Sequence, residues 1–120
     1  MANIELSNVS RVFQRDGKDF LTLDGINLTV VDREFVVIVG PSGCGKTTCM
    51  RMAAGLEFPT SGTVKVNNEI VKAPGPDRAV VFQQFALFPW KTVYENIDFG
   101  LRSKGIELEK RKKTIAGYIE

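Results

Sequence analysis

The stretch FVVIVGPSGCGKTT, residues 35–48, decides how this chain folds. Its first part, Phe35–Val39, is continuously apolar, and a strand of that composition has to be covered on both faces, as in the parallel sheet of an α/β fold. Apolar residues then recur at helical spacing over Lys46–Leu56, with Gly55 and the later Pro59 as stop signals. The stretch therefore predicts a buried strand, a glycine-rich loop and a helix.

The glycine-rich loop GPSGCGKTT meets the spacing G-x-x-x-x-G-K-[ST] of a phosphate-binding loop. Its glycines let the backbone approach phosphate oxygens, and the helix that begins near Lys46 points its partial positive end at the anion. The Lys46 ammonium would reach the β and γ phosphates, and the Thr47 hydroxyl would bind Mg²⁺. The alternative, a glycine-rich turn with no ligand, explains neither the strand before the loop nor the helix after it. The pattern predicts these nucleotide-binding residues: Gly40, Pro41, Ser42, Gly43, Cys44, Gly45, Lys46 and Thr47.

Four further segments read as strands. Apolar residues alternate along Ile4–Phe13 and Ile26–Val30, which predicts two half-buried strands joined by a polar turn. The segment Val64–Ile70 predicts a hairpin, because its two adjacent asparagines tolerate the positive φ of a tight turn. Ala79–Phe82 is a short apolar run and predicts a second buried strand.

Two helices are predicted near the end of the sequence. Thr92 and Glu95 have the spacing of a capping box, which favours a helix over Val93–Leu101. The stretch ELEKRKKTIAGYIE, residues 107–120, places Leu108, Ile115 and Ile119 on one side of a helix and charges on the other. The charged face is expected to be solvated, with an anionic partner as the less favoured alternative.

Composition sets limits on the function classes. The net charge of +2 gives no electrostatic reason to expect nucleic acid or an anionic membrane surface as a partner. The two cysteines, Cys44 and Cys49, form no disulfide framework and are expected to be reduced thiols, with Cys44 a small residue filling a tight loop. No apolar run is long enough to cross a bilayer and no leader follows Met1, so the chain is expected in the cytosol.

Three segments in order resemble the ATP-binding subunit of an ABC transporter. They are the loop GPSGCGKTT, the segment AAGLEFPTSGTVKV after the helix, and the segment VVFQQFALFPWKTVYENIDFGL. The last is similar to the family's Q-loop and the start of its helical subdomain. The combination of GPDRAVVFQ with LFPW resembles the nitrate, sulfonate and taurine importers most.

The resemblance assigns roles to individual positions. Gln83 matches the Q-loop glutamine, which in the family touches Mg²⁺ and the attacking water, and its neighbour Gln84 is the less favoured candidate. Phe13 matches the aromatic residue that stacks on adenine, with a core residue at a strand end as the alternative. Thr48 matches a position on the α-phosphate side. The segment Ala86–Trp90 matches the surface that receives a helix of the transmembrane permease, although its aromatic residues could instead close the core.

The resemblance also implies a fold class and a domain organisation. The fold class is α/β, a partial P-loop NTPase core with an N-terminal antiparallel β subdomain and the start of the ABC helical subdomain. The implied divisions are 1–34 for the antiparallel strands, 35–58 for the P-loop strand and helix, 59–85 for strands leading to the Q-loop, and 86–120 for the helical subdomain. Family members often carry glycine where this chain has Arg33, so the turn there could differ.

Several features of the family are absent from the sequence. No apolar run is followed by Asp-Glu, the LSGGQ signature does not occur, and the chain has no histidine. The resemblance therefore covers the N-terminal half of a subunit that binds ATP and Mg²⁺, pairs with a second subunit and a permease on the inner face of the cell membrane, and hydrolyses ATP when complete. Taken alone, the chain is expected not to hydrolyse ATP. A module that only binds ATP or docks to a permease is the alternative, and a nucleic-acid-associated ATPase is disfavoured by the near-neutral charge.

The resemblance has a consequence for stability. In the family a further strand pairs beside the P-loop strand, so Phe35–Val39 alone would keep unpaired backbone groups and an exposed apolar face. The isolated chain is therefore expected to be marginally stable or self-associating.

Overall fold

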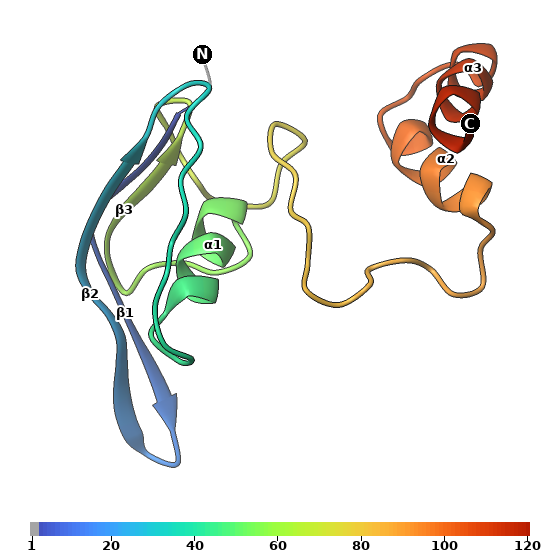
Figure 1. The fold of residues 1–120 in the computed structure, drawn as a ribbon. Coiled ribbons are helices and arrows are strands. Elements are labelled where there is room, and N and C mark those ends of the chain that lie inside the picture. Colours follow the sequence, from blue (N-terminus) through green and yellow to red (C-terminus); the bar gives the residue numbers. More distant parts are fainter. Residues whose placement is uncertain (1–2) are drawn as a thin grey trace. The chain divides into compact units, whose positions relative to one another are not determined.

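The computed structural model describes residues 3–120. The chain divides between Val80 and Val81 into two compact units (Figure 1). The first unit contains strands β1 (Ile4–Arg15), β2 (Lys18–Val30), β3 (Ser61–Val66) and β4 (Glu69–Ile70) and helix α1 (Lys46–Ala54). The second unit contains helices α2 (Val93–Ser103) and α3 (Leu108–Ile119).

The strands of the first unit form one antiparallel sheet in the order β2-β1-β3-β4. β1 and β2 form a long hairpin that turns at Asp16 and Gly17, both with positive φ. β3 and β4 turn at Asn67 (φ 52°) and Asn68 (φ 66°), the left-handed conformation that asparagine tolerates. The predictions of both hairpins are confirmed.

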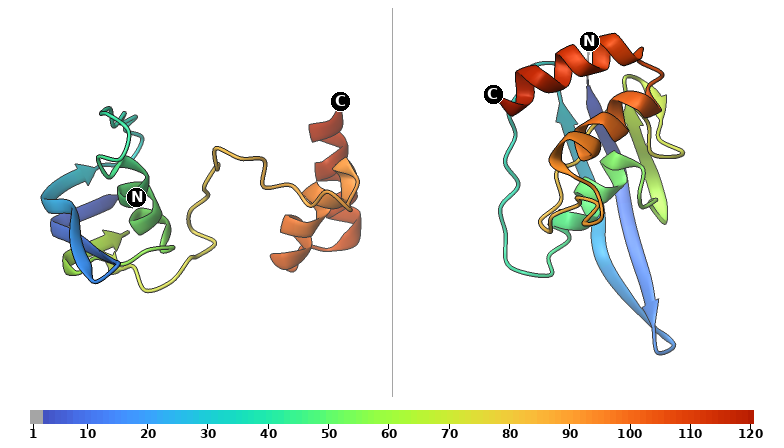
Figure 2. Two further views of the ribbon diagram at one scale, coloured as in Figure 1. Left: turned by 90° about the horizontal axis from the view of Figure 1, so that it is seen from below. Right: turned by 90° about the vertical axis from the view of Figure 1, so that its right-hand side faces the viewer.

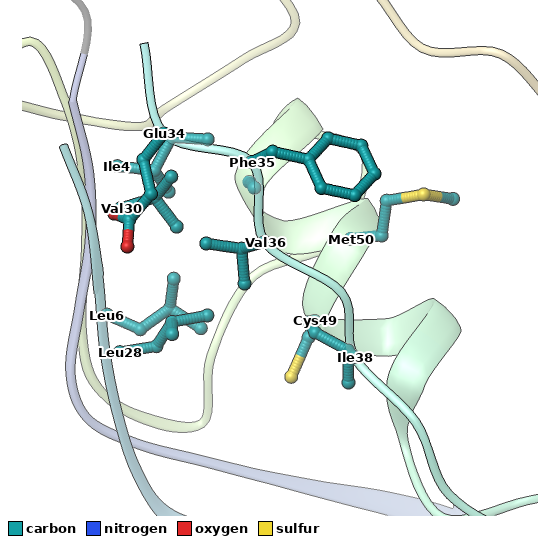
Figure 3. A pocket seen from close by; sticks show the side chains of 11 residues that line it. Ile4, Leu6, Leu28, Val30, Glu34, Phe35, Val36, Ile38, Cys49 and Met50 are labelled. Atoms are coloured by element: carbon teal, nitrogen blue, oxygen red, sulfur yellow. The ribbon is translucent and has the colours of Figure 1, made fainter. Parts of the chain in front are cut away.

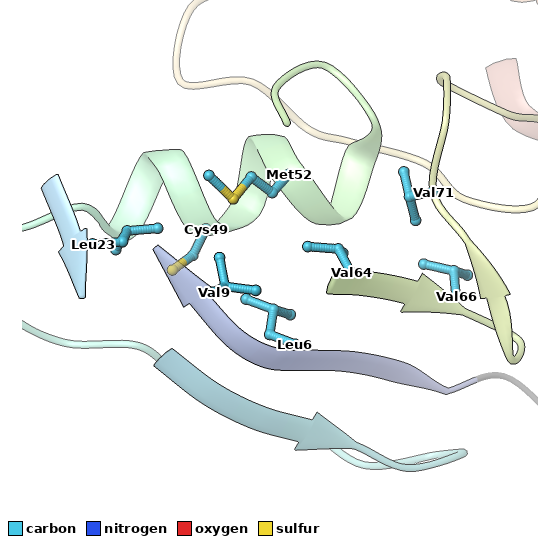
Figure 4. Packing of buried hydrophobic residues seen from close by; sticks show 8 residues of the cluster. All are labelled: Leu6, Val9, Leu23, Cys49, Met52, Val64, Val66 and Val71. Carbon is cyan, nitrogen blue, oxygen red and sulfur yellow. The ribbon is translucent and has the colours of Figure 1, made fainter. Parts of the chain in front are cut away.

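Helix α1 packs on one face of this sheet (Figures 2 and 4). It ends at Gly55, whose φ of 79° suits glycine and where a Cβ would lie 2.3 Å from the Ala73 carbonyl oxygen. Met52 is completely buried beneath the helix. The core cluster on this face consists of Leu6, Val9, Leu23, Cys49, Met52, Val64, Val66 and Val71.

The segments Phe35–Val39 and Ala79–Phe82 are not strands, and this corrects the sequence prediction. Phe35 is 89% exposed and Val39 84%, and Val81 in the later segment is 91% exposed. A strand exists only when a neighbouring strand takes up its backbone hydrogen bonds. Neither segment has a ladder partner within residues 3–120, and most of their apolar side chains remain exposed.

Arg33 adopts a backbone conformation that usually belongs to glycine. Its φ is 63°, and the turn there brings the Glu34 N–H to the Val31 carbonyl oxygen at 3.1 Å. The Glu34 carboxylate in turn accepts a hydrogen bond from the Val31 N–H at 2.9 Å. The turn therefore takes a glycine-like course without a glycine, at a cost of about 1 kcal/mol.

In the second unit, the capping box predicted at the start of α2 is confirmed. The Thr92 hydroxyl accepts a hydrogen bond from the Glu95 N–H, and the Glu95 carboxylate accepts one from the Thr92 N–H at 2.7 Å. These bonds lower the pKa of Glu95. A partly buried ion pair joins the two helices, because Arg111 of α3 donates to the Asp98 carboxylate at 2.6 Å.

The apolar face predicted for α3 is only partly correct. Ile115 is fully buried, but Leu108 and Ile119 are both about half exposed. No helix within residues 3–120 has the length and hydrophobicity needed to cross a membrane.

Candidate functional site: a phosphate-binding loop

The loop between Phe35–Val39 and α1 is shaped by two glycines in the left-handed region. Gly43 has a φ of 79° and Gly45 a φ of 96°. A Cβ on Gly45 would lie 2.5 Å from the Leu23 side chain and 2.9 Å from the Thr22 carbonyl oxygen. A side chain at this position would therefore push the loop off β2, and the loop keeps its place on the sheet only with glycine there.

The Lys46 ammonium lies against the carbonyl groups of the loop. Its Nζ donates to the carbonyl oxygens of Gly40 and Pro41, both at 2.6 Å, and lies 3.5 Å from the Cys44 Sγ. These contacts fold the lysine side chain back over the loop from the first residue of α1. The cation is thus held next to the same loop whose N–H groups would receive an anion.

Both cysteines are free thiols, as predicted. Cys44 is exposed, and its Sγ would lie 2.7 Å from a Cβ on Gly40. The middle of the loop can therefore lie this close to its first residue only because Gly40 has no side chain. Cys49 is buried in the core, where desolvation, with a smaller contribution from Cys44, raises the pKa of its thiol. Cys49 belongs to the core rather than to the loop.

The chemistry of the loop fits phosphate. The first N–H groups of α1 have no partner within the helix, and the first turn carries no acidic residue. Ser42, Gly43 and Thr47 are exposed to solvent, and Thr48 is half-buried. Residues 3–120 hold no cluster of three or more His, Cys, Asp or Glu side chains. The exposed Thr47 hydroxyl could hold Mg²⁺ together with phosphate oxygens and water, an arrangement that suits this ion.

The structure places the other predicted residues in two different units. Phe13 lies half-buried on β1, paired with Phe20 of β2. Its position relative to the loop follows from the register, because Leu23, which contacts Gly45, pairs with Arg11 two residues before Phe13. Gln83 is an exposed residue of the second unit, in a stretch without helix or strand. Its role stays a prediction.

An apolar groove of the first unit is a different feature from the loop (Figure 3). It has a volume of about 360 Å³ and an almost wholly apolar lining, and it contains none of the residues Gly40–Thr48. Val36 and Ile38 of the exposed segment line it together with Leu6 and Leu28 of the sheet. An apolar groove does not bind phosphate, so we do not assign the nucleotide to it.

In the second unit, the segment Ala86–Trp90 is held against α2. The Asn96 side chain accepts a hydrogen bond from the Phe88 N–H at 2.9 Å and donates to the Lys91 carbonyl oxygen at 3.1 Å. The Phe88 ring contacts the rings of Trp90 and Phe99, with centroids 5.5 and 4.8 Å apart. Trp90 remains 76% exposed. This segment is thus an ordered surface with exposed apolar side chains.

Similarity to known proteins extends over almost the whole chain. The family model described as ABC transporter matches residues 23–119. The "Uncharacterized ABC transporter ATP-binding protein MJ0412" of Methanocaldococcus jannaschii is 45% identical over 117 residues, which is 98% of this chain and 44% of that protein. The "Nitrate import ATP-binding protein NrtD" of Synechocystis is 42% identical over 118 residues, with the same two shares. The "Bicarbonate transport ATP-binding protein CmpD" of Synechococcus elongatus is 45% identical over 92 residues, 77% of this chain and 33% of that protein. This chain spans less than half the length of these relatives.

A solved structure shows the same fold. The dimeric post-hydrolysis state of the ATP-binding cassette MJ0796, bound to ADP and Pi, has a TM-score of 0.82 and 31% identity. The match covers 95% of this chain and 54% of that one. The predicted fold class is thereby confirmed.

Proposed function

The chain belongs to the ABC transporter family of ATP-binding proteins, and from that premise we propose that it binds MgATP at the loop Gly40–Thr48. The observation that carries this proposal is the loop itself, in which two left-handed glycines and the Lys46 ammonium stand at the start of α1. A similar cassette has been solved with ADP and Pi bound. Backbone N–H groups and a nearby cation are the groups that proteins use to hold phosphates.

Each residue of the loop has a proposed role. Lys46 exchanges its bonds to the loop carbonyls for bonds to the β and γ phosphates, while the Thr47 hydroxyl would bind Mg²⁺. Thr48 lies on the α-phosphate side. When bound, Mg²⁺ neutralises the charge of the phosphate oxygens.

Phe13 is the proposed stacking partner of the adenine ring, and Phe13→Ala tests it. The substitution is expected to weaken MgATP binding by about 1–3 kcal/mol, as for bases stacked on aromatic side chains elsewhere. Calorimetric titration of both proteins with MgATP measures the difference. The matched control is Phe20→Ala, which removes the partly exposed cross-strand neighbour of Phe13. If the Phe13→Ala variant binds MgATP with unchanged affinity, Phe13 is only a packing residue of the hairpin and does not stack on adenine.

We propose that the ATP-binding protein serves an importer of small oxyanions at the cytoplasmic face of the membrane. Two relatives are named for import of nitrate and transport of bicarbonate. The segments GPDRAVVFQ and LFPW of the sequence also resemble sulfonate and taurine importers. A second copy of the chain would complete the site, and the similar cassette MJ0796 has been solved as a dimer. The second candidate function is a module that binds ATP or docks to a permease without hydrolysis, favoured by the lack of an Asp-Glu pair and of histidine in the sequence.

The proposed contact with the permease is the segment Ala86–Trp90. Leu87 is 66% exposed and Trp90 76%, and a groove of about 260 Å³ lies between this segment and the start of α2. Exposed apolar side chains on an ordered backbone are typical of a partner surface.

Trp90→Ala tests this contact. The substitution is expected to weaken binding to the permease partner by about 2 kcal/mol, the effect of a central aromatic residue in an interface. Titration with the purified permease in detergent measures it. The matched control is Tyr118→Ala, because Tyr118 is equally exposed at 76% but lies on α3. Equal losses in the two variants would contradict a specific site at Trp90.

A further inference from the structure

The Arg11 side chain lies between an aromatic ring and a carboxylate. Its Cζ is 4.4 Å from the centroid of the Phe13 ring, and its Nη2 forms an ion pair with Glu57. The side chains of Arg11 and Glu57 are only 24% and 22% exposed. The guanidinium is therefore largely removed from water, where both a cation–π contact and an ion pair are stronger than at an open surface.

The position of Arg11 links three parts of the candidate site. On the sheet Arg11 pairs with Leu23, the residue that contacts Gly45 of the loop. Phe13 follows two residues later on the same strand, about 7 Å further along. Glu57 comes two residues after Gly55, the residue at which α1 ends. Arg11 thus lies between the ring proposed for adenine and the segment that follows α1.

We propose that Arg11, held by Glu57, is a positioning residue that fixes the Phe13 ring for stacking on the nucleotide base. The guanidinium lies against the ring and limits its rotation, while Phe13 remains partly exposed and so available to a base. This inference rests on the proposed function, because it assigns Arg11 to the site at which ATP is proposed to bind.

A purely structural role for the ion pair is less consistent with the contacts around it. The segment after α1 is already tied to β1 without Arg11, since the Thr60 N–H donates to the Ser10 carbonyl oxygen at 2.8 Å. The Thr60 hydroxyl also accepts a hydrogen bond from the Val12 N–H at 3.0 Å. Loss of the Arg11 side chain leaves both of these bonds in place. Within residues 3–120, however, Arg11 is the only cationic side chain that lies over the Phe13 ring.

The test compares two ligands, MgATP and magnesium tripolyphosphate, on the 120-residue chain. Tripolyphosphate needs the loop but has no base, so it reports on the phosphate site alone. Arg11→Met and Glu57→Gln are each expected to weaken MgATP about fivefold and to leave tripolyphosphate within twofold. In the Phe13→Ala background, Arg11→Met is expected to have no further effect. The matched control is Arg15→Met, because Arg15 lies on the same strand with its side chain 84% exposed.

The outcomes separate this inference from the proposed function. If Arg11→Met weakens both ligands equally, Arg11 only supports the fold and the inference is wrong. The inference is also wrong if Arg11→Met weakens the binding of neither ligand, or if it weakens MgATP binding as much in the Phe13→Ala background as in the unaltered chain. If the unaltered chain binds tripolyphosphate at least as tightly as MgATP, the base adds no affinity. Phe13 then stacks on no base, and the role proposed for Arg11 is wrong. If the unaltered chain binds neither ligand, the proposed function itself is overturned.

Discussion

Lys46→Ala is expected to abolish measurable MgATP binding. The ammonium is the only side-chain cation that the structure places within the loop Gly40–Thr48, and it would form charge-assisted bonds to two phosphates. Their loss is expected to cost about 3 kcal/mol, more than a hundredfold in Kd. Titration calorimetry with MgATP and with tripolyphosphate measures the effect, and both ligands should lose affinity together.

The control for Lys46→Ala is Lys72→Ala, because Lys72 is an exposed lysine of the same unit outside the loop. It removes one positive charge without touching the site and is expected to leave both affinities unchanged. If the Lys46→Ala variant still binds MgATP, the proposal that the loop is the nucleotide site is wrong. The unaltered chain is expected to show no ATP turnover above background, and hydrolysis that disappears in Lys46→Ala would contradict that expectation.

Met52→Ala is expected to lower the free energy of unfolding of the first unit by about 3 kcal/mol. Met52 is fully buried between α1 and the sheet (Figure 4), and its truncation leaves a cavity that the surrounding valines and leucines cannot fill. Because small domains are stable by only several kcal/mol, the variant is expected to be largely unfolded at 37 °C. Urea denaturation followed by far-UV circular dichroism measures the change.

The matched control is Met50→Ala on the same helix. Met50 is 44% exposed, so the same truncation removes little buried surface and is expected to change stability by less than about 1 kcal/mol. Equal destabilisation by the two substitutions would mean that α1 does not pack on the sheet through Met52. The comparison also tests how firmly the glycine-rich loop is anchored, since the loop leads directly into α1.

Local signals in the sequence were sufficient for several elements. The Gly45–Lys46 start of α1, its stop at Gly55 and the Asn67–Asn68 turn all depend on residues close together in the chain. The capping box of Thr92 and Glu95 is local in the same way. For such features the residue types themselves restrict the backbone, and the prediction needs no knowledge of the rest of the fold.

The candidate site was predicted only in part. The pattern of the loop identified Lys46 and its neighbours, but the sequence did not indicate that Lys46 bonds to the carbonyls of Gly40 and Pro41. The role of Arg11 was also missed. Strand alternation places Arg11 and Phe13 on one face, which is a usable signal, but the partner Glu57 lies 46 residues away in the sequence.

The sequence by itself determined the glycine-rich loop, the two hairpins and the starts of α1 and α2, because these depend on glycine, asparagine and capping residues acting over a few positions. Only the tertiary structure decided whether an apolar run becomes a strand. Phe35–Val39 and Ala79–Phe82 have the composition of buried strands, yet both stay exposed and unpaired within residues 3–120. A strand needs a neighbour for its backbone hydrogen bonds and cover for its faces, and neither requirement can be read from the strand's own residues.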